Sequence, residues 1–341
     1  MQIAQRKIKI LKAVVEAYIK NGEPVGSKLL CNALDFPVSS ATVRNEMAEL
    51  SDLGFLMQPH TSAGRIPSQQ GYRLYVNSLM DKKTLSGDTK ALIYDKLVRA
   101  GDDPEKLLAA AAKIAAELTH SAVIAAAPSS EEARIHKLRF VQTGLKTGMA
   151  VLITSGGLIK TALFKCDYVI TPDIIRVFES MFNRSMEGVP IRRITPAFVQ
   201  TLAVEMGELA LLVPSVLAAV MTACREVGDS RIVVEGRTNL IDLGTGDNQK
   251  ELLKFIHDDD ALETLAESIK HSENIAIGTD TGFEELHANS VISCKYSTET
   301  SVSGSIAAIV PMRTDYAYDA AVLEYTAQCV SGLLKALLMI D

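Results

Sequence analysis

The sequence predicts an α+β protein built from more than one domain, and three observations support this. The chain has 341 residues, whereas a single domain commonly holds roughly 100–200 residues. Hydrophobic residues make up 48% of the chain and charged residues 22%, which is typical of a folded protein and argues against a disordered one. Apolar residues recur at helical spacing in some blocks and form strand-like runs in others, and this segregation favours the α+β class.

Three helices are expected first. Apolar residues recur at helical spacing over 8–19, and the pattern stops at Asn21-Gly22. A shorter helix fits residues 26–34, because a proline-containing break follows it. Ser39 is a suitable N-cap for a third helix that ends near Gly54. The residues expected on the inward face of that helix are Val43, Met47 and Leu50.

A wing is predicted directly after the third helix. Residues 55–57 fit a short strand, residues 58–65 form a polar loop that contains glycine, and Ile66-Pro67 would return as a second strand. A helix that starts near Ser68 then closes the module. Residues 1–80 are therefore predicted to form a winged helix-turn-helix domain.

The rest of the chain is predicted to be one α+β domain that carries an insertion. Residues 81–88 are polar and lack periodicity, so we place a domain boundary there. Strand-like runs occur on both sides of a helical block at 171–228, which indicates the insertion. The strands are expected at 122–127, 138–143, 149–154, 158–165, 231–243, near 275, 291–296 and 305–310, and the other helices at 107–118, 249–270 and 322–336. The second, third and fourth of these strands would form an antiparallel meander.

Positive charge is concentrated in the first module. The whole chain has a formal net charge of −6. Residues 1–80 hold nine Lys and Arg against six Asp and Glu, a net +3, while the remaining residues hold 26 against 35, a net −9. This asymmetry is compatible with a DNA-facing module on an acidic body.

The third helix carries side chains suited to the major groove of double-stranded DNA. Arg44 could pair bidentately with a guanine and Asn45 with an adenine, while the helix start suits a phosphate. An ordinary exposed helix face is the alternative, and the acidic residues that follow from Glu46 to Asp52 favour it. The candidate DNA-binding residues of this helix are Ser39, Ser40, Thr42, Arg44 and Asn45. Those of the wing, which could instead be merely solvated, are His60, Thr61, Ser62 and Arg65.

These segments resemble one known family. Residues 40–50, the wing segment His60-Thr61-Ser62-Ala63-Gly64-Arg65-Ile66-Pro67 and the following Gly71-Tyr72-Arg73 closely resemble the HrcA heat-inducible repressors. The wing segment is the most specific of them. Residues 236–240 and 311–316 extend the resemblance over the whole chain. The turn Gly278-Thr279-Asp280-Thr281 and the strand pair Ala307-Ala308 depart from the family pattern, which puts a regulatory pocket in doubt but not repression.

The resemblance implies an architecture and a set of partners. It implies a winged helix over 1–80, a GAF-like domain made of 89–167 and 271–341, and a mainly helical dimerising domain inserted at 168–270. It also implies repression of chaperone operons through an inverted-repeat operator, and a chaperonin that keeps the repressor active. A winged-helix regulator whose GAF-like domain senses a small-molecule effector is the alternative function.

Other function classes lack support in the sequence. Neither a Gly-x-Ser-x-Gly elbow, a Walker loop nor a His-Glu-x-x-His motif is present, so neither an enzyme nor a bound cofactor is expected. The cluster Asp258-Asp259-Asp260 precedes a helical pattern and is interpreted as a helix cap instead of a metal site. The five cysteines lack metal-type pairing, and neither a signal peptide nor a membrane span is indicated, so a cytoplasmic protein is expected.

A homodimer is expected, because two winged helices related by a two-fold axis match a palindromic operator. The apolar run 209–224 within the inserted block is the preferred interface, with Leu212 and Val216 as its representatives. Burial of that run against its own domain is the alternative.

Overall fold

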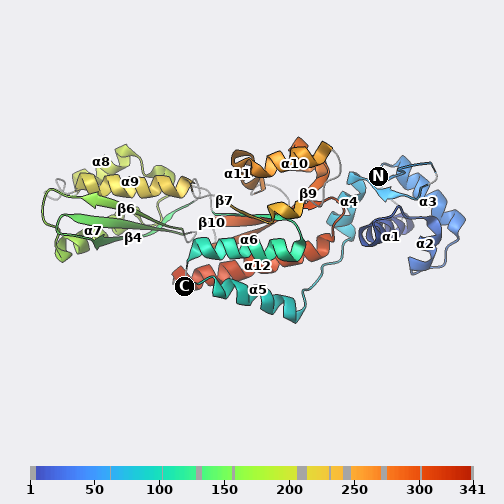
Figure 1. The fold of residues 1–341 in the computed structure, drawn as a ribbon, viewed down its shortest axis with the longest axis horizontal. Coiled ribbons are helices and arrows are strands. Elements are labelled where there is room, and N and C mark those ends of the chain that lie inside the picture. The colour runs from blue at the N-terminus through green and yellow to red at the C-terminus, as the bar shows by residue number, and fades with distance from the viewer. Residues whose placement is uncertain are drawn as a thin grey trace.

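The computed structural model describes residues 5–61, 63–101, 103–127, 133–155, 158–205, 213–229, 232–240, 247–269, 275–299 and 302–338. Helices and sheets occur together throughout, so the α+β class is confirmed. The molecule is elongated, with the N-terminal helices at one end, a large sheet covered by helices in the middle, and a second sheet with its own helices at the other end (Figure 1).

The N-terminal unit has the predicted succession of three helices and a two-stranded ribbon. The third helix ends at Leu53 and Gly54, where the chain turns with a φ of +82° at Gly54. Strands β1 and β2 pair antiparallel, with Leu56 opposite Pro67. The elements are α1 (Gln5–Asn21), α2 (Ser27–Ala33), α3 (Ser40–Asp52), β1 (Leu56–Met57), β2 (Ile66–Pro67), α4 (Gln69–Leu74) and a π-helical turn (Tyr75–Leu79). The unit is closed by α4, which Ser68 caps through a hydrogen bond from the Gly71 amide.

A five-stranded antiparallel sheet forms the centre of the body, in the order β7-β3-β10-β9-β8. Its strands are β3 (Ala122–Ala126), β7 (Ile232–Glu235), β8 (Ile275–Ile277), β9 (Asn289–Glu299) and β10 (Val302–Pro311). Helices α6 and α12 cover one face and α10 and α11 the other (Figure 1). The helices of the body are α5 (Gly87–Arg99), α6 (Pro104–Thr119), α10 (Asp247–His257), α11 (Asp259–Ile269) and α12 (Tyr316–Leu338).

The continuous apolar run of β3 is explained by this double cover. Val123 and Ala125 belong to the main core, whereas Ala122 and Ile124 pack in a second cluster with residues of α10 and α11. Because successive side chains of a strand point to opposite faces, a strand covered on both sides must be apolar at every position.

The second sheet lies at the far end of the molecule, in the order β4-β5-β6. Phe140 of β4 contacts Phe178 and Phe182 of α7, with ring centroids 6.1 and 5.2 Å apart. The elements of this outer unit are β4 (Ile135–Gln142), β5 (Thr147–Thr154), β6 (Ile159–Lys165), α7 (Pro172–Met186), α8 (Pro196–Glu205) and α9 (Val213–Asp229). Helix α9 lies along β5 and β6.

The residues that pack on each sheet differ from those expected from the predicted borders of the insertion. The predicted meander is present, but it forms a sheet of its own with α7 and α9 and does not join β3. Residues 247–269, which were expected in the inserted block, instead cover the central sheet. The described residues between 133 and 229 therefore form a sheet of their own with helices, and they lie in sequence between strands β3 and β7 of the central sheet. Helix α5 was not predicted, because its residues fell at the edge of the polar linker.

Only one of the two predicted interface residues lies within the described residues. Val216 of α9 is fully buried within its own chain, and Leu212 lies outside the described residues.

The cysteines differ in exposure: Cys166, Cys224 and Cys294 are buried, whereas Cys31 and Cys329 are partly exposed. Across the described ranges, no helix is both long and apolar enough to cross a bilayer.

Candidate nucleic-acid interface

Helix α3 begins with a cap of short polar side chains. The Ser39 side chain accepts a hydrogen bond of 3.1 Å from the amide of Thr42, and its Oγ lies 2.8 Å from the Thr42 hydroxyl. The Ser40 hydroxyl is 2.9 Å from that of Ser27 at the start of α2. Ser39 therefore satisfies one of the amides that a helix start leaves free. Ser40 fixes α3 to α2, a use that the sequence did not indicate.

The two faces of α3 divide as the sequence predicts. Val43, Met47 and Leu50 are buried in the unit's core, which confirms the inward face. Arg44 and Asn45 are exposed on the opposite side. The helix thus presents one cation and one amide on its first two turns, where a groove-reading helix makes its base contacts.

Two of the three acidic residues of α3 form ion pairs with α1. Glu46 is only 6% exposed, and its Oε1 accepts a hydrogen bond of 2.8 Å from Arg6 Nε. Lys7 Nζ lies 3.6 Å from Glu46 Oε2 and 2.8 Å from Glu49 Oε2. These contacts also raise the pKa of Lys7, chiefly through its hydrogen bond to Glu49. Glu46 therefore ties α3 to α1 and is absent from the outward face. Asp52 is exposed at the far end of the helix.

The wing is held by backbone and side-chain hydrogen bonds. Gln58 Nε2 donates to the carbonyl oxygens of Thr61 and Ala63, each at 3.0 Å, and so closes the loop. Val25, in the segment between α1 and α2, exchanges two backbone hydrogen bonds of 2.9 Å with Arg65. A Cβ on Gly64 would lie 2.4 Å from the Val25 carbonyl oxygen, so only glycine permits this close approach. His60 and Thr61 are exposed, and Ser62 lies outside the described residues.

Side chains from α3 and from the wing meet around one hollow of about 480 Å³. Arg44 of α3 and Thr61 and Arg65 of the wing all line it. Arg65 Nε is buried and has no hydrogen-bond partner in the described part of the chain. A buried donor without a partner is costly.

The basic residues of the N-terminal unit fall into two groups. Most are neutralised by carboxylates, as in the pairs of Lys9 with Asp35 at 2.8 Å and of Lys12 with Asp81 at 2.6 Å. Within the described residues, the cations of this unit that have no ion pair are Lys20, Lys28, Arg44 and Arg65. Lys28 lies exposed on α2, and the sequence analysis missed it because α2 carries no motif of its own. The net charge of the module therefore indicates less about DNA binding than the identity of the cations that have no carboxylate partner.

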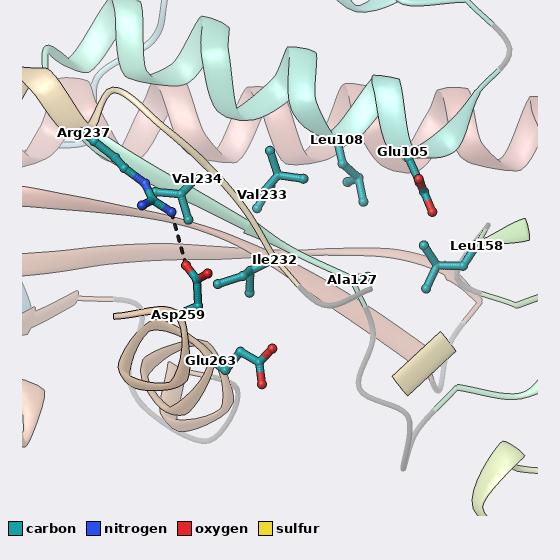
Figure 2. Close-up of a pocket in the computed structure, with 11 residues that line it drawn as sticks. Glu105, Leu108, Ala127, Leu158, Ile232, Val233, Val234, Arg237, Asp259 and Glu263 are labelled. Carbon is teal, nitrogen blue, oxygen red and sulfur yellow. Dashed lines mark hydrogen bonds and ion pairs between the residues drawn. The ribbon is translucent and has the colours of Figure 1, made fainter. Parts of the chain in front are cut away.

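A second cavity, of about 430 Å³, lies in the body at the edge strand β7 (Figure 2). Ile232, Val233 and Val234 of β7 and Leu108 of α6 provide apolar lining. Arg237 and Asp259 form an ion pair of 3.3 Å at one end of it, as Figure 2 shows. The Asp258 side chain caps α11 by accepting 3.1 Å from the Ala261 amide, which confirms the predicted cap. Three or more His, Cys, Asp or Glu side chains arranged to hold a metal do not occur within the described ranges.

Comparison with known proteins finds one family that matches this chain. A family model described as the HrcA protein C-terminal domain matches residues 105–318. A heat-inducible transcription repressor HrcA of Alkaliphilus metalliredigens is 31% identical over 340 residues, which cover 98% of this chain and 99% of that protein. One of Clostridium perfringens (strain 13 / Type A) is 32% identical, covering 92% and 94%. A solved structure of a hypothetical protein has a TM-score of 0.62 at 24% identity and covers 98% of this chain and all of that one.

Proposed function

This chain belongs to the HrcA family, whose named members are heat-inducible transcription repressors, and from that premise we propose that it represses chaperone operons in the cytoplasm as a DNA-bound homodimer. The operator would be an inverted repeat in double-stranded DNA. The first eighty residues would read it as a winged helix-turn-helix, with α3 in the major groove and the wing beside it.

The observation that carries this proposal is the convergence of Arg44, Thr61 and Arg65 on one hollow. Two arginines without carboxylate partners in the described chain come from α3 and from the wing, so they would meet one duplex at two places. Arg44 would make a bidentate contact with a guanine, and Asn45 beside it would contact an adenine. Arg65, which lines the hollow without a carboxylate partner in the described chain, would contact a phosphate or the minor groove.

A footprint tests the assignment. The purified protein should protect an inverted repeat upstream of chaperone operons and leave unrelated promoter fragments unprotected. Arg99→Ala, which removes an exposed arginine of α5 far from the hollow, should leave the footprint unchanged and serves as the control. Protection without any repeat, or none on these regions, would contradict the proposal.

The exposed face of the outer sheet supports the homodimer. Val141, Met149 and Leu163 lie side by side across β4, β5 and β6, and Val141 and Leu163 are 46% and 73% exposed. Ile159 adds a further exposed side chain to the same face. An apolar patch of this kind marks a surface that another molecule covers, and a second copy would bring two DNA-binding units to the two arms of an inverted repeat.

The interface therefore lies, in our proposal, on this sheet face and not at Val216, which is buried in its own chain. Leu163→Asp should give folded monomers with weak operator affinity, because its side chain is already mostly exposed in the single chain. Leu92→Asp, at an exposed apolar position of α5, is the matched control. Sedimentation that shows an intact Leu163→Asp dimer would move the interface elsewhere.

We also propose regulation by a chaperonin, which the resemblance to the family implies. A marginally stable repressor would unfold and release the operons on heating, since a change of about one or two kcal/mol in the free energy of unfolding alters the folded fraction several-fold. Chaperonin would return unfolded repressor to the active pool. Mild heating should abolish operator binding irreversibly, and chaperonin with ATP should raise the active fraction without a small ligand. Full reversible binding that ignores chaperonin would contradict this.

The cavity beside β7 favours a second candidate function, a regulator that senses a small molecule in its GAF-like domain. Its lining combines apolar side chains with a few polar groups, the Arg237–Asp259 pair, Glu105 and Glu263, and such a combination is typical of a small-ligand pocket (Figure 2). A metabolite that changes operator binding of the wild-type protein but not of Arg237→Ala would establish it.

A further inference from the structure

We propose that four junction residues, Gln69, Arg73, Asp280 and Arg313, are positioning residues that fix the DNA-binding unit on the body and thereby set which half-site spacing the dimer accepts. This inference rests on the proposed function, because spacing matters only to a dimer on an inverted repeat. Two of the four come from α4, directly after the wing, and two from the body. None of them lines the hollow between α3 and the wing.

The first attachment joins α4 to the turn Gly278–Thr281. Gln69 Nε2 donates 2.7 Å hydrogen bonds to the Ile277 carbonyl oxygen and to the Thr279 hydroxyl. Arg73, one helical turn further on, forms an ion pair with Asp280. Gly278 has a φ of +56°, and a Cβ there would lie 2.8 Å from Gln69 Oε1. Glycine at position 278 therefore allows the positive φ of this turn and leaves room for the Gln69 side chain.

The second attachment joins α1 to the loop before α12. Arg313 Nη1 donates to the Ile19 carbonyl oxygen at 3.3 Å, near the C-terminal end of α1. Between the two attachments, Tyr72 of α4 packs on Tyr316, with ring centroids 5.9 Å apart and both side chains almost fully buried. The Tyr316 hydroxyl donates to the Met312 carbonyl oxygen at 2.6 Å and so holds this loop in place.

The connecting segment is itself held on both sides. Lys12 of α1 pairs with Asp81 at 2.6 Å, and Lys83 pairs with Asp315 at the start of α12. A segment of seven residues without secondary structure, 80–86, would otherwise leave the unit free to turn. Because the contacts come from both α1 and α4 and accompany a buried aromatic pair, they oppose rotation as well as separation.

Fixed orientation has a consequence for a two-fold dimer. Two recognition helices must meet successive major grooves about 34 Å apart. If the two DNA-binding units are held at that distance, the second unit meets its arm of the repeat at a high effective concentration. Units that turn freely lose this gain in affinity, although each unit keeps its own contacts to DNA. The junction residues therefore affect binding to the whole repeat and its spacing, but not binding to one arm.

The test compares wild type with the double variant Gln69→Ala/Arg73→Ala in the full-length dimer. The probe is the inverted repeat that wild type recovers from a random duplex pool, together with versions whose spacer is changed by three base pairs and a version with one arm scrambled. We expect the variant to bind the intact repeat at least tenfold more weakly, to bind the one-armed duplex within twofold of wild type, and to discriminate less between spacers. The charge swap Arg73→Asp/Asp280→Arg should restore much of the spacing preference, and Arg99→Ala should behave as wild type.

The outcomes separate this inference from the proposed function. If wild type recovers no inverted repeat, the proposed function fails. If it recovers one and the variant keeps wild-type affinity and spacing preference, only the junction role fails. Tighter binding by the variant would also overturn it, because the contact would then be inhibitory. Equal losses on the intact and the one-armed duplex would show damage to the DNA-binding unit itself, which likewise refutes a positioning role.

Discussion

Gly64→Ala should detach the base of the wing from the helical part of the N-terminal unit. A Cβ at this position would lie 2.4 Å from the carbonyl oxygen of Val25 and 2.7 Å from that of Pro24. Both are backbone atoms, so the two segments must move apart. The two 2.9 Å hydrogen bonds between Val25 and Arg65 would then be lost. At about 1 kcal/mol each, this costs about 2 kcal/mol, or about thirtyfold in the equilibrium for local opening.

Amide hydrogen exchange measures this opening directly. The amides of Val25 and Arg65 should exchange about thirtyfold faster in the variant, while the amides of α12 keep their protection. Operator affinity should fall as well, because Arg65 is displaced from the hollow. The matched control is Gly26→Ala, one residue beyond Val25, where no atom lies within 4 Å of the new Cβ and φ is −90°. Unchanged exchange at both amides in Gly64→Ala would refute the close-packing argument.

Two further perturbations have expected outcomes. Ser39→Ala removes the side-chain cap of α3 and should lower the stability of the N-terminal unit by about 1 kcal/mol, seen as faster amide exchange in the first turn of α3; exchange identical to wild type would contradict the cap. Burial raises the pKa of Asp319 to about 7, against a lowering by the Thr314 hydroxyl, so the native state keeps a proton that the unfolded chain has already released above about pH 4. Stability from this group is therefore complete below pH 4 and is lost as the pH rises to 7, and Asp319→Asn should melt higher than wild type at pH 8 but with a smaller difference at pH 5. A constant difference between the two pH values would contradict the raised pKa.

Local signals in the sequence were sufficient to predict the buried face, the exposed face and the cap of α3 in the N-terminal unit. The spacing of Val43, Met47 and Leu50 predicted the buried face of α3, and Ser39 was correctly identified as its cap. These features depend on residues within a few positions of one another, so they can be recognised without the fold. Arg44 and Asn45 were expected on the exposed face for the same reason, and the structure places them there.

Long-range contacts could not be predicted in this way. The periodicity of β4, β5 and β6 identified strands, but strand pattern does not say which sheet a strand joins. Glu46 was considered an argument against DNA binding, and only its partner forty residues earlier, Arg6, shows that it faces α1. The contact of Arg73 with Asp280 crosses 207 positions of the chain, and nothing local to either residue points to the other.

In the proposed mode of binding, α3 reads bases while the wing contacts the DNA backbone, and a comparison of Arg44→Ala with Arg65→Ala tests this division most directly. Affinities of both variants and wild type should be measured on the operator and on a random duplex over a range of salt concentrations. Arg44→Ala should lose roughly 1–3 kcal/mol on the operator and much less on the random duplex. Arg65→Ala should lose similarly on both and lower the salt slope by about one. Wild-type behaviour of both variants, or an equal loss for Arg44→Ala on the two duplexes, would contradict the assignment of α3 as the reading helix.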